Sequence, residues 1–390
     1  MGRVIIIGGG IGGLTAAIAL RKVGFDAHVY ERAPALREVG AGIGVMANAL
    51  RALDALGLGD NLRSQGLAAV QGGLRDPAGK VLLAMPMHDL TGQAGAIAVV
   101  HRAELLAELA SHVDQERLHL DCKCVGFTQD HEGVTARFHN GETARGDALI
   151  GADGLRSAIR TQLFGDQAIR YAGYTAWRSV VRFEIPDHPV ITETWGRGRR
   201  FGIVPMSRGR VYWFAVQNAI EGERDPDGKS GDALAGLFRG WHQPIEPLIA
   251  ASEAGSILRN DVYDMEPLAR WSDRRVTLMG DAAHPMTPNL GQGACQAIED
   301  AVVLAVCLKT NATVQGALVQ YERRRMTRTK QIVLSARRLG AVAQAENAAV
   351  CLVRNAAMRA TPRSLAARQT RALLDYDPLT ESERKLFARP

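Results

Sequence analysis

The chain of 390 residues lacks several features that define other classes of protein. It has only five cysteines, an odd number, and no two of them are spaced as Cys-x-x-Cys, which argues against a disulfide framework and a zinc site. No apolar run reaches the roughly 18–20 residues of a membrane-spanning helix. The first buried run begins at Arg3, which leaves no room for a secretory leader. We therefore expect a protein of the reducing cytoplasm without an integral membrane segment or a metal site.

Aromatic residues are also scarce, at 5% of the chain, and they are unevenly distributed. Many of them fall in a β-rich stretch from Tyr171 to Val216, which predicts a separate antiparallel sheet. The net charge of +6 comes largely from arginines late in the chain. Because no nucleic-acid-binding motif accompanies these arginines, we interpret them as the solvated face of C-terminal helices and expect no nucleic-acid partner.

A glycine-rich turn inside a strand–helix–strand unit dominates the first 32 residues. Arg3–Ile7 has the pattern of a buried strand, and Gly8, Gly10 and Gly13 follow it with the spacing G-x-G-x-x-G. In such a unit the glycines allow a tight turn and close approach of a diphosphate, which the N-terminus of the next helix stabilises. A second strand ends at Glu31, near the distance of about 20 residues at which an acid binds ribose hydroxyls. The unit predicts a site for FAD or NAD rather than NADP.

The expected elements indicate an α/β fold: a Rossmann-like FAD-binding domain, an inserted antiparallel β-sheet domain for substrate, and C-terminal helices. The predicted division is 1–70, 98–170 and 270–345 for the discontinuous FAD-binding domain, 71–97 and 171–269 for the sheet domain, and 346–390 for the C-terminal helical segment. Long helices are expected over about 313–339 and 347–374.

The stretch from Gly280 to Ala301 carries the features that select the chemistry. Asp281 follows a buried strand, where its carboxylate can accept hydrogen bonds from sugar-like hydroxyls. After a proline-stiffened loop, Gly291 and Gly293 leave the N–H groups of a helix start bare. A helix N-terminus stabilises negative charge, and a reduced flavin is anionic along its N1–C2=O2 edge, so we predict that this helix points at a flavin ring. His284 is interpreted as a packing residue, because no partner stands at a useful spacing.

Three motifs in order carry a resemblance to a known family. They are the Gly8–Gly13 turn, the sequence Gly151-Ala152-Asp153-Gly154 with Arg156 and Ser157, and the Gly280–Asp281 stretch. Over nearly its whole length the chain resembles the class A, single-component flavoprotein monooxygenases, which include para-hydroxybenzoate, salicylate and urate hydroxylases. The resemblance implies non-covalent FAD and NADH or NADPH as transient reductant. It also implies that one oxygen atom of O2 enters an aromatic or heteroaromatic small molecule through a flavin C4a-hydroperoxide, in a monomer or homodimer.

The resemblance further implies cofactor contacts position by position. The adenosine and diphosphate end matches Gly8, Gly10, Ile11, Gly12, Gly13, Glu31 and Arg32, with a backbone contact at Val125. The ribityl and diphosphate region matches Gly44, Arg102 and Asp281, while Asp153 serves both FAD and the nicotinamide cofactor with Arg156 as its companion. The turn against the flavin ring matches Gly291, Gln292, Gly293, Ala294 and Cys295. Ala47 departs from the family pattern, which often has proline there.

Few catalytic side chains are expected, because the cofactor carries the difficult chemistry. The candidates for substrate binding are Arg200 and Tyr212 on the inserted sheet, with Pro288 and Asn289 from the loop opposite. Arg200 is suited to an anionic substrate, and Tyr212 to hydrogen bonding or to deprotonation of a phenol. The alternatives are a surface arginine in a basic run and an ordinary strand aromatic. Asn289 stands where urate-hydroxylase-like relatives tend to have an acid.

Three rival interpretations stay open. An FAD-dependent epoxidase of an alkene, of the zeaxanthin-epoxidase type, fits the Pro288–Gly293 sequence almost as well. An amine oxidase shares only the N-terminal motif, and the W-x-W-x-I-P string of a halogenase is missing. A nucleotide-binding or nucleic-acid-binding module without enzymatic activity is the third rival, and the absorbance of a bound flavin would exclude it.

Overall fold

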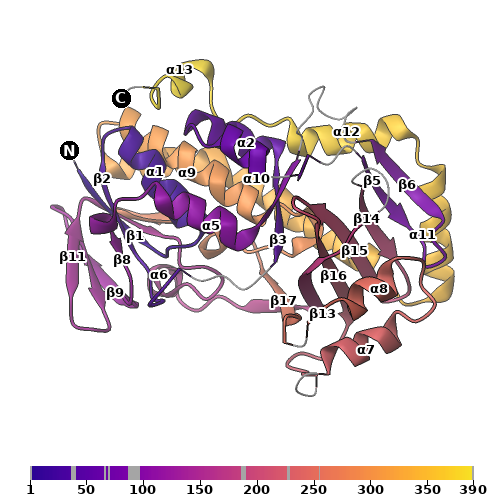
Figure 1. The fold of residues 1–390 in the computed structure, drawn as a ribbon. Coiled ribbons are helices and arrows are strands. Elements are labelled where there is room, and N and C mark those ends of the chain that lie inside the picture. Colours follow the sequence, from indigo (N-terminus) through magenta and orange to yellow (C-terminus); the bar gives the residue numbers. More distant parts are fainter. Residues whose placement is uncertain are drawn as a thin grey trace.

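The computed structural model describes residues 2–36, 41–65, 67–68, 71–86, 97–185, 190–225, 229–253 and 255–388. Figure 1 shows an elongated molecule with a parallel sheet at one end and a larger sheet at the other, and the long helix α10 runs from one to the other. The predicted Rossmann-like fold with an inserted sheet and C-terminal helices is confirmed. No described helix combines the length and hydropathy needed to cross a membrane.

The first sheet assembles strands from three distant segments of the chain. Within the described residues it has six strands in the order β18-β19-β12-β1-β2-β8, and every pair except β18 with β19 is parallel. The strands are β1 (Arg3–Ile7), β2 (Asp26–Tyr30), β8 (Leu118–His119), β12 (Ala148–Gly151), β18 (Ser272–Asp273) and β19 (Val276–Leu278). Parallel strands end at one edge of a sheet, so the loops after β1, β12 and β19 meet there.

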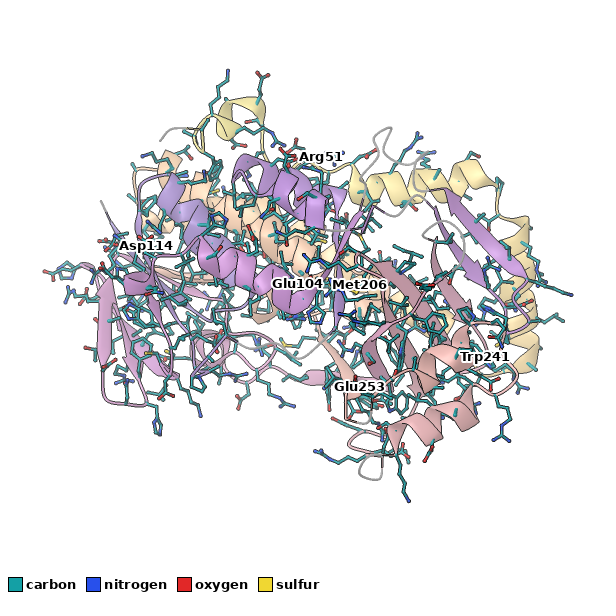
Figure 2. All side chains as sticks on the ribbon, in the orientation of Figure 1. Arg51, Glu104, Asp114, Met206, Trp241 and Glu253 are labelled. Atoms are coloured by element: carbon teal, nitrogen blue, oxygen red, sulfur yellow. The ribbon has the colours of Figure 1, made fainter. Side chains whose placement is uncertain are left out.

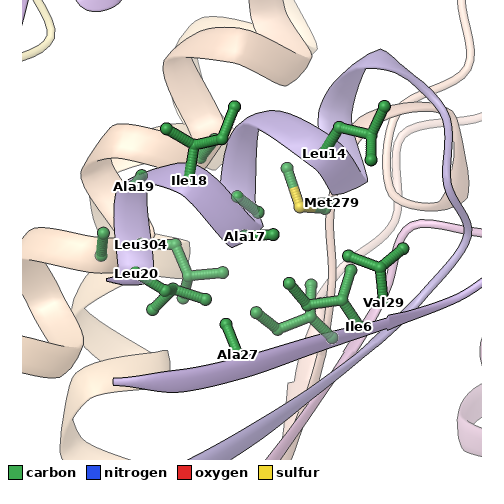
Figure 3. Packing of buried hydrophobic residues seen from close by; sticks show 14 of the residues in the cluster. Ile6, Leu14, Ala17, Ile18, Ala19, Leu20, Ala27, Val29, Met279 and Leu304 are labelled. Carbon is green, nitrogen blue, oxygen red and sulfur yellow. The ribbon is translucent and has the colours of Figure 1, made fainter. Parts of the chain in front are cut away.

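Helix α1 (Ile11–Lys22) packs between this sheet and α9 (Gly293–Thr310). Leu14, Ala17 and Leu20 are fully buried against Ile6 and Leu304 (Figure 3). Small residues such as Ala17 allow the helix to approach its neighbours closely, and the long side chains between them fill the remaining space. This core fixes the positions of the β1–α1 turn and the start of α9.

The second sheet has seven strands within the described residues, in the order β17-β13-β16-β15-β14-β5-β6. All of its neighbouring pairs are antiparallel except β14 with β5. The strands are β5 (Gln71–Arg75), β6 (Val81–Pro86), β13 (Ile169–Arg182), β14 (Val190–Trp195), β15 (Arg199–Met206), β16 (Arg210–Asn218) and β17 (Leu258–Met265). Residues alternate between its faces, so a single strand serves two environments.

One face of this sheet is closed by α7 (Ser230–Leu237) and α8 (Ile245–Ala250). Trp177, Phe201 and Trp213 pack there against the apolar residues of both helices. Tyr212 and Phe214, which alternate with Trp213 on β16, face the opposite side, toward the first sheet and its loops. This face of the sheet, which lies toward the nucleotide-binding part, is therefore the one that can contribute to a site.

Smaller elements connect these two bodies. Among the described residues, a three-stranded sheet contains β3 (Gly42–Met46), β7 (Ile97–His101) and β4 (Leu67–Ala68), and another contains β9 (Cys124–Gln129), β10 (Val134–Phe138) and β11 (Thr143–Gly146). The helices among them are α2 (Ala47–Ala55), α3 (Gly59–Gln65), α5 (Arg102–Ser111) and α6 (Ala158–Phe164).

The junction between the bodies is visible in Figure 2, where Glu104 of α5 lies near Met206 of β15. Arg210 donates two hydrogen bonds to the Glu104 carboxylate there, at 2.8 and 3.0 Å. A bidentate arginine–carboxylate pair fixes orientation as well as distance, so it holds α5 against the large sheet.

The C-terminal part of the chain is helical: α10 (Val314–Ala343), α11 (Ala348–Ala360), α12 (Arg363–Leu374) and the short α13 (Glu381–Arg384). The single helix predicted over 347–374 is wrong, because the chain turns between α11 and α12 at Pro362. Proline has no N–H to donate and restricts the preceding residue, so a helix ends before it and a new one begins after it.

Candidate functional site

The glycines of the β1–α1 turn have different surroundings. A Cβ on Gly8, whose φ is +112°, would lie 2.3 Å from the Ala152 carbonyl oxygen, and a Cβ on Gly13 would lie 1.9 Å from the Gly8 carbonyl oxygen. A Cβ on Gly10 would meet nothing within 4 Å. Gly10 is the N-cap of α1, and no described side chain caps this helix. The turn is therefore tightly packed on its inner side and open at the helix N-terminus.

Glu31 lies beside this opening, at the end of β2. Its carboxylate accepts hydrogen bonds from the N–H groups of Gly9 (2.6 Å) and Ala33 (2.9 Å), while Arg32 is exposed. The Glu31 carbonyl accepts the Cys122 N–H at 2.8 Å, which brings the start of β9, with the exposed Val125, to the same edge. The residues predicted for the adenosine end thus gather at one place.

Asp153 follows β12 and is half-buried. Its carboxylate accepts hydrogen bonds from the Ser157 hydroxyl (2.5 Å) and the Ile159 N–H (3.2 Å), so it caps α6. Burial raises the pKa of Asp153, and these hydrogen bonds oppose the rise. Arg156, its predicted companion, is exposed. The structure thus shows a helix-capping role for Asp153, while its contact with a cofactor stays a prediction.

A buried arginine that the sequence did not single out joins two of the motifs. Arg160 is 3% exposed, and its Nη1 and Nη2 donate to the carbonyl oxygens of Ala282 (3.0 Å) and Leu155 (2.5 Å). It therefore ties the loop after β12 to the loop after β19. An arginine inside an amphipathic helix looks like a surface residue in the sequence, so only the tertiary contacts identify it.

The Gly280–Asp281 turn lies next to the first glycine turn. A Cβ on Gly12 and a Cβ on Gly280 would both approach the Ala297 methyl group, at 3.1 and 3.2 Å. Asp281 remains accessible to solvent although protein surrounds it closely, and this desolvation raises its pKa, while His284 and Arg102 lower it. The positive charge of Arg102, at the start of α5, thus favours the ionised form of the Asp281 carboxylate.

At the start of α9 the backbone N–H groups, rather than the side chains, are available to bind a ligand. Gly291 has φ +62°, and the N-cap residue Gln292 makes no side-chain cap to a described N–H. The Gln292 side chain is buried and bonds to Asn48 instead. The Cys295 thiol is buried 3.7 Å from the Gly44 carbonyl oxygen, and burial raises the pKa of Cys295 to about 12, so this thiol stays protonated and unreactive.

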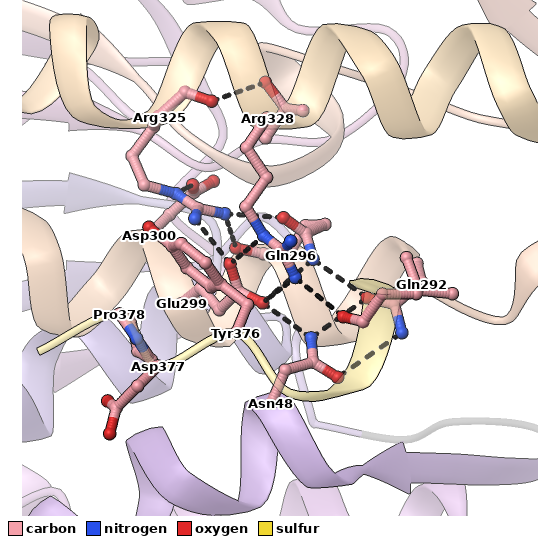
Figure 4. A network of polar contacts seen from close by, with 12 residues as sticks. Asn48, Gln292, Gln296, Glu299, Asp300, Arg325, Arg328, Tyr376, Asp377 and Pro378 are labelled. Carbon is pink, nitrogen blue, oxygen red and sulfur yellow. Dashed lines mark hydrogen bonds and ion pairs between the residues drawn. The ribbon is translucent and has the colours of Figure 1, made fainter. Parts of the chain in front are cut away.

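Behind this helix start lies a buried polar network, shown in Figure 4. Asn48 Nδ2 donates to Glu299 (2.5 Å), and Arg325 pairs with both Glu299 (2.5 Å) and Asp300 (2.7 Å). Arg328 adds a further pair to Glu299 at 3.0 Å. Glu299, Asp300 and Arg325 are each fully buried.

Asp300 also connects this network to the Gly280 turn. Its Oδ2 accepts the Gly280 N–H at 3.0 Å and lies 2.6 Å from His284 Nε2. Burial alone would raise the pKa of Asp300, but its interactions with His284 and Arg325 hold it down at about 2. His284 therefore has a partner, sixteen residues along the chain. The sequence could have indicated this partner, because Glu299 and Asp300 are two acids inside the otherwise apolar helix α9, and buried acids need partners.

The sheet residue Tyr212 lies opposite β3. A Cβ on Gly42 would come within 2.5 Å of the Tyr212 Cβ, so the two strands are in direct contact at this glycine. Burial raises the pKa of Tyr212 to about 12, and Arg178 and Arg102 act in the opposite direction. The Phe214 ring lies on the same face, 6.0 Å from the Tyr212 ring. Arg102 thus influences both Asp281 on the nucleotide side and Tyr212 on the sheet.

Arg200 and Asn289 are brought together as predicted, but they bind each other. Arg200 is 3% exposed, and its Nη2 donates to Asn289 Oδ1 at 2.9 Å. Its other donors bind Gln344 (2.7 Å) and Glu193 (3.0 Å). The alternative of a surface arginine is therefore wrong. Pro288 beside them is exposed, and contact of any of these residues with a substrate stays a prediction.

These surroundings suit a long dinucleotide with an anionic middle. Two helices, α1 and α9, present uncapped N-termini at neighbouring turns, and the open side of Gly10 leaves room for a diphosphate. Helix N-termini bind phosphate and other anions through free N–H groups. The donor set therefore suits FAD.

A family model described as FAD binding domain matches residues 1–336, so the chain belongs to this family of FAD-binding proteins. It is a class A flavoprotein hydroxylase, and the predicted FAD cofactor and monooxygenase class are confirmed.

The chain is 42% identical over 379 residues to the aurachin C monooxygenase/isomerase of Stigmatella aurantiaca, covering 96% of this chain and 98% of the relative. It is 36% identical over 344 residues to an FAD-dependent urate hydroxylase of Klebsiella pneumoniae, covering 86% and 89%. The crystal structure of Klebsiella pneumoniae HpxO in complex with FAD and uric acid matches with a TM-score of 0.90 and 32% identity, over 97% of this chain and 98% of that one.

Proposed function

We propose that this enzyme consumes NADH or NADPH and inserts one oxygen atom of O2 into an aromatic or heteroaromatic small molecule. The observation that carries the proposal is that strand β3 joins the two parts, because Gly42 packs against Tyr212 and the Gly44 carbonyl oxygen lies 3.7 Å from the Cys295 thiol at the start of α9. Asp281 belongs to the nucleotide-binding part and Tyr212 to the large sheet. A flavin held near Asp281 would therefore face the aromatic side of the sheet.

The proposed cofactor contacts are those expected from the sequence. The N-terminus of α1 at Gly10 would hold the diphosphate, and Glu31 the adenosine ribose. Asp281 and Arg102 would contact the ribityl region, and the backbone of Gly291–Cys295 the flavin ring. When bound, FAD supplies the acceptance of hydride and the activation of O2 for transfer to the substrate.

The protein's own part is to orient the substrate and to exclude water. Tyr212 keeps its proton at neutral pH, because burial raises its pKa to about 12. It is therefore suited to donate a hydrogen bond to a substrate oxygen or nitrogen and poorly suited to act as a general base. Phe214 beside it supplies an apolar wall, and a site closed by the sheet limits the entry of water.

Asn289 and Arg200 form the polar end of this chamber in the proposal. Asn289 Nδ2 also donates to Tyr174 Oη (2.9 Å) and to the Ala336 carbonyl (2.9 Å), so the amide is held firmly. Arg200 uses three of its five N–H donors on protein partners, and the others would recognise carbonyl or carboxylate oxygens of a substrate. The relatives that act on urate and aurachin C support an aromatic or heteroaromatic substrate.

We also propose the division into parts that the sequence indicated, with the substrate domain formed by 71–97 and 171–269. The nicotinamide cofactor would bind transiently, attracted by the net positive charge of +6. A cytoplasmic monomer or homodimer remains the expected form.

The test is to follow NADH and NADPH oxidation by the FAD-loaded enzyme with a panel of phenols, aromatic acids and nitrogen heterocycles under 18O2. A substrate should accelerate oxidation of the reductant and carry one 18O atom in the product. Peroxide as the only product with every compound would contradict the proposal. An epoxide formed from a polyene would favour the alkene epoxidase instead.

A further inference from the structure

A cavity of about 430 Å³ lies on the far side of the Gly280–His284 loop. Its walls are the loop of residues 267–271, Ala283 and His284, and the face of α10 between Glu322 and Val333. Trp271, Met326 and Val333 give it an apolar interior. This volume is within the range of about 300–1,000 Å³ typical of small-molecule sites, and far larger than one water molecule needs.

His284, one of the residues that line the cavity, has a ring nitrogen without a partner among the described residues. His284 is 4% exposed, and its Nδ1 makes no hydrogen bond with any described residue. The other ring nitrogen, Nε2, lies 2.6 Å from the Asp300 carboxylate, which only accepts, so Nε2 carries a proton. Nδ1 is then an acceptor in the neutral ring or a donor in the charged ring. A hydroxyl group satisfies it in either state.

The mouth of the cavity carries positive charge. Arg323 and Lys330 line it, are exposed, and form no ion pair with a described residue. The carboxylate of Glu322 also lines the cavity, but its Oε2 accepts the backbone N–H groups of Trp271 and Ser272, each at 2.9 Å. Among the described residues, the mouth therefore has two cationic side chains without an ion-pair partner and one carboxylate that is already hydrogen-bonded to the backbone.

The shape and the polar groups together define a ligand. The Trp271 ring lies 5.3 Å from the His284 ring, centroid to centroid, and suits a flat apolar body. We propose that this cavity is a second binding site, for a small planar anion with a hydroxyl group at its inner end and a carboxylate at its mouth. None of its lining residues belongs to the cofactor cleft or to the sheet face that carries Tyr212.

The position of the cavity links it to the flavin loop. The His284 ring that would contact the ligand is bonded to Asp300, which also accepts the Gly280 N–H. The site is therefore connected to the turn that carries Asp281 through a single residue, Asp300. In the proposal its occupant is an effector or a reservoir molecule rather than the reacting substrate.

The first experiment locates the ligand directly. Crystals of the oxidised FAD enzyme are soaked in 3-bromo-4-hydroxybenzoate without any reductant, and the anomalous signal of bromine is mapped. A peak between Trp271 and Met326 is the expected result. A peak confined to the Tyr212 side of the molecule, or no peak at all, would overturn the proposal. Because no turnover is needed, this outcome is independent of the proposed monooxygenase reaction.

The second experiment measures affinity in solution by 19F NMR with 3-fluoro-4-hydroxybenzoate. Lys330→Glu should weaken binding about tenfold, since it replaces attraction by repulsion at a partly exposed pair. Arg338→Glu is the matched control, because Arg338 is exposed on the same helix, undergoes the same change in charge and does not line the cavity. Equal effects of the two variants would refute the site.

The inner end is tested with a matched pair of probes. Compared with 3-fluoro-4-hydroxybenzoate, 3-fluoro-4-methylbenzoate has nearly the same shape but no hydroxyl group, so it leaves His284 Nδ1 unpaired. We expect it to bind about fivefold to tenfold more weakly, as for a lost buried hydrogen bond. Met326→Trp, which fills the cavity, should abolish binding of both probes, and undiminished binding to that variant would count against the proposal.

Discussion

The helices α1 and α9 both present an uncapped N-terminus to the proposed FAD cleft, yet they are held in place by different means. Behind α1 the contacts are apolar, and residues such as Ile6, Leu14 and Val29 come from the same strand–helix–strand unit. Behind the start of α9 they are polar and ionic, and Asn48 and Arg325 reach it from distant parts of the chain.

This difference indicates how each end of the cofactor would be fixed. Apolar packing depends on area and shape and tolerates many neighbours, so it needs no particular partner for each side chain. A buried carboxylate such as Glu299 needs a partner of opposite charge with correct geometry. The diphosphate end therefore rests on apolar packing, which α1 also shares with α9, whereas the flavin end depends on specific charge partners from distant segments.

The strongest test of the local unit is Gly13→Ala. The new Cβ would lie 1.9 Å from the Gly8 carbonyl oxygen, and backbone cannot move away as a side chain does. We expect the free energy of unfolding to fall by more than about 4 kcal/mol, measured by urea denaturation. Gly231→Ala is the control, because its Cβ would meet nothing within 4 Å and it lies in helix α7. Equal stability of the two variants would contradict close packing at this turn.

The corresponding test of the ionic network is Arg325→Met. It leaves Glu299 and Asp300 buried with fewer partners, although Arg328 and His284 remain. Breaking a buried ion pair costs about 3–5 kcal/mol, and we expect a loss near 3 kcal/mol in thermal or urea unfolding. The exposed Arg338→Met on the same helix should change stability by less than about 0.5 kcal/mol. A similarly small loss for Arg325→Met would mean that the network contributes little.

Gly10→Ala separates folding from cofactor binding. A methyl group there meets no protein atom within 4 Å, but it projects into the space assigned to the diphosphate. The apoprotein should unfold at the wild-type temperature, while FAD affinity falls about a hundredfold, near 3 kcal/mol. Titration of the apoprotein with FAD, followed by flavin fluorescence, measures the change. Wild-type affinity would show that the diphosphate does not pass this glycine.

The network also predicts a pH dependence of stability. Asp300 has a pKa of about 2 in the folded state, below its ordinary value of 3.8, so its stabilising contribution is present above pH 4 and is lost as the pH falls through 2. The contribution at neutral pH is about 2 kcal/mol. Asp300→Asn lacks this group, so the stability difference from wild type should be largest above pH 5 and shrink toward pH 2 in acid-dependent urea unfolding. A difference that stays constant with pH would exclude Asp300 as its source.

The smallest expected effect concerns the sheet side. Tyr212→Phe removes one hydrogen-bond donor, so we expect kcat/KM to fall about tenfold, or 1.4 kcal/mol, while FAD affinity and stability stay unchanged. Tyr171→Phe is the control, because Tyr171 donates to the Ala219 carbonyl elsewhere in the sheet. The wild-type pH profile should show no ionisation of Tyr212 below about pH 11. Unaltered kcat/KM would remove Tyr212 from the site.

Most elements could be predicted from the sequence, because their patterns are local. The strand Arg3–Ile7 has the predicted bounds. The break at Pro362 was also readable, but the apolar periodicity on both sides of it favoured one continuous helix. The parallel pairing of β5 with β14 was not readable, since these strands lie far apart in the sequence.

The site was predictable in its turns and not in its supporting side chains. Gly8, Gly10 and Gly13 are read from spacing, because Gly8 and Gly13 leave no room for a Cβ and Gly10 keeps the helix N-terminus open to a ligand. Arg160, Arg325 and Asn48 were missed, because polar residues in a helical pattern are indistinguishable from surface residues until their partners are known. The buried state of Arg200 belongs to the same class.

The sequence by itself determined that this chain builds a nucleotide-binding unit with an acid at the end of β2 and a glycine-rich start to α9. Hydrophobic periodicity and glycine spacing are patterns among residues close in sequence, so they can be recognised before the tertiary structure is known. Only the tertiary structure decided which charges become partners, as in the contact of Asp300 with Gly280, His284 and Arg325. The reason is physical: a charge inside a protein is stable only beside its counterpart, and the counterpart is set by how distant segments pack.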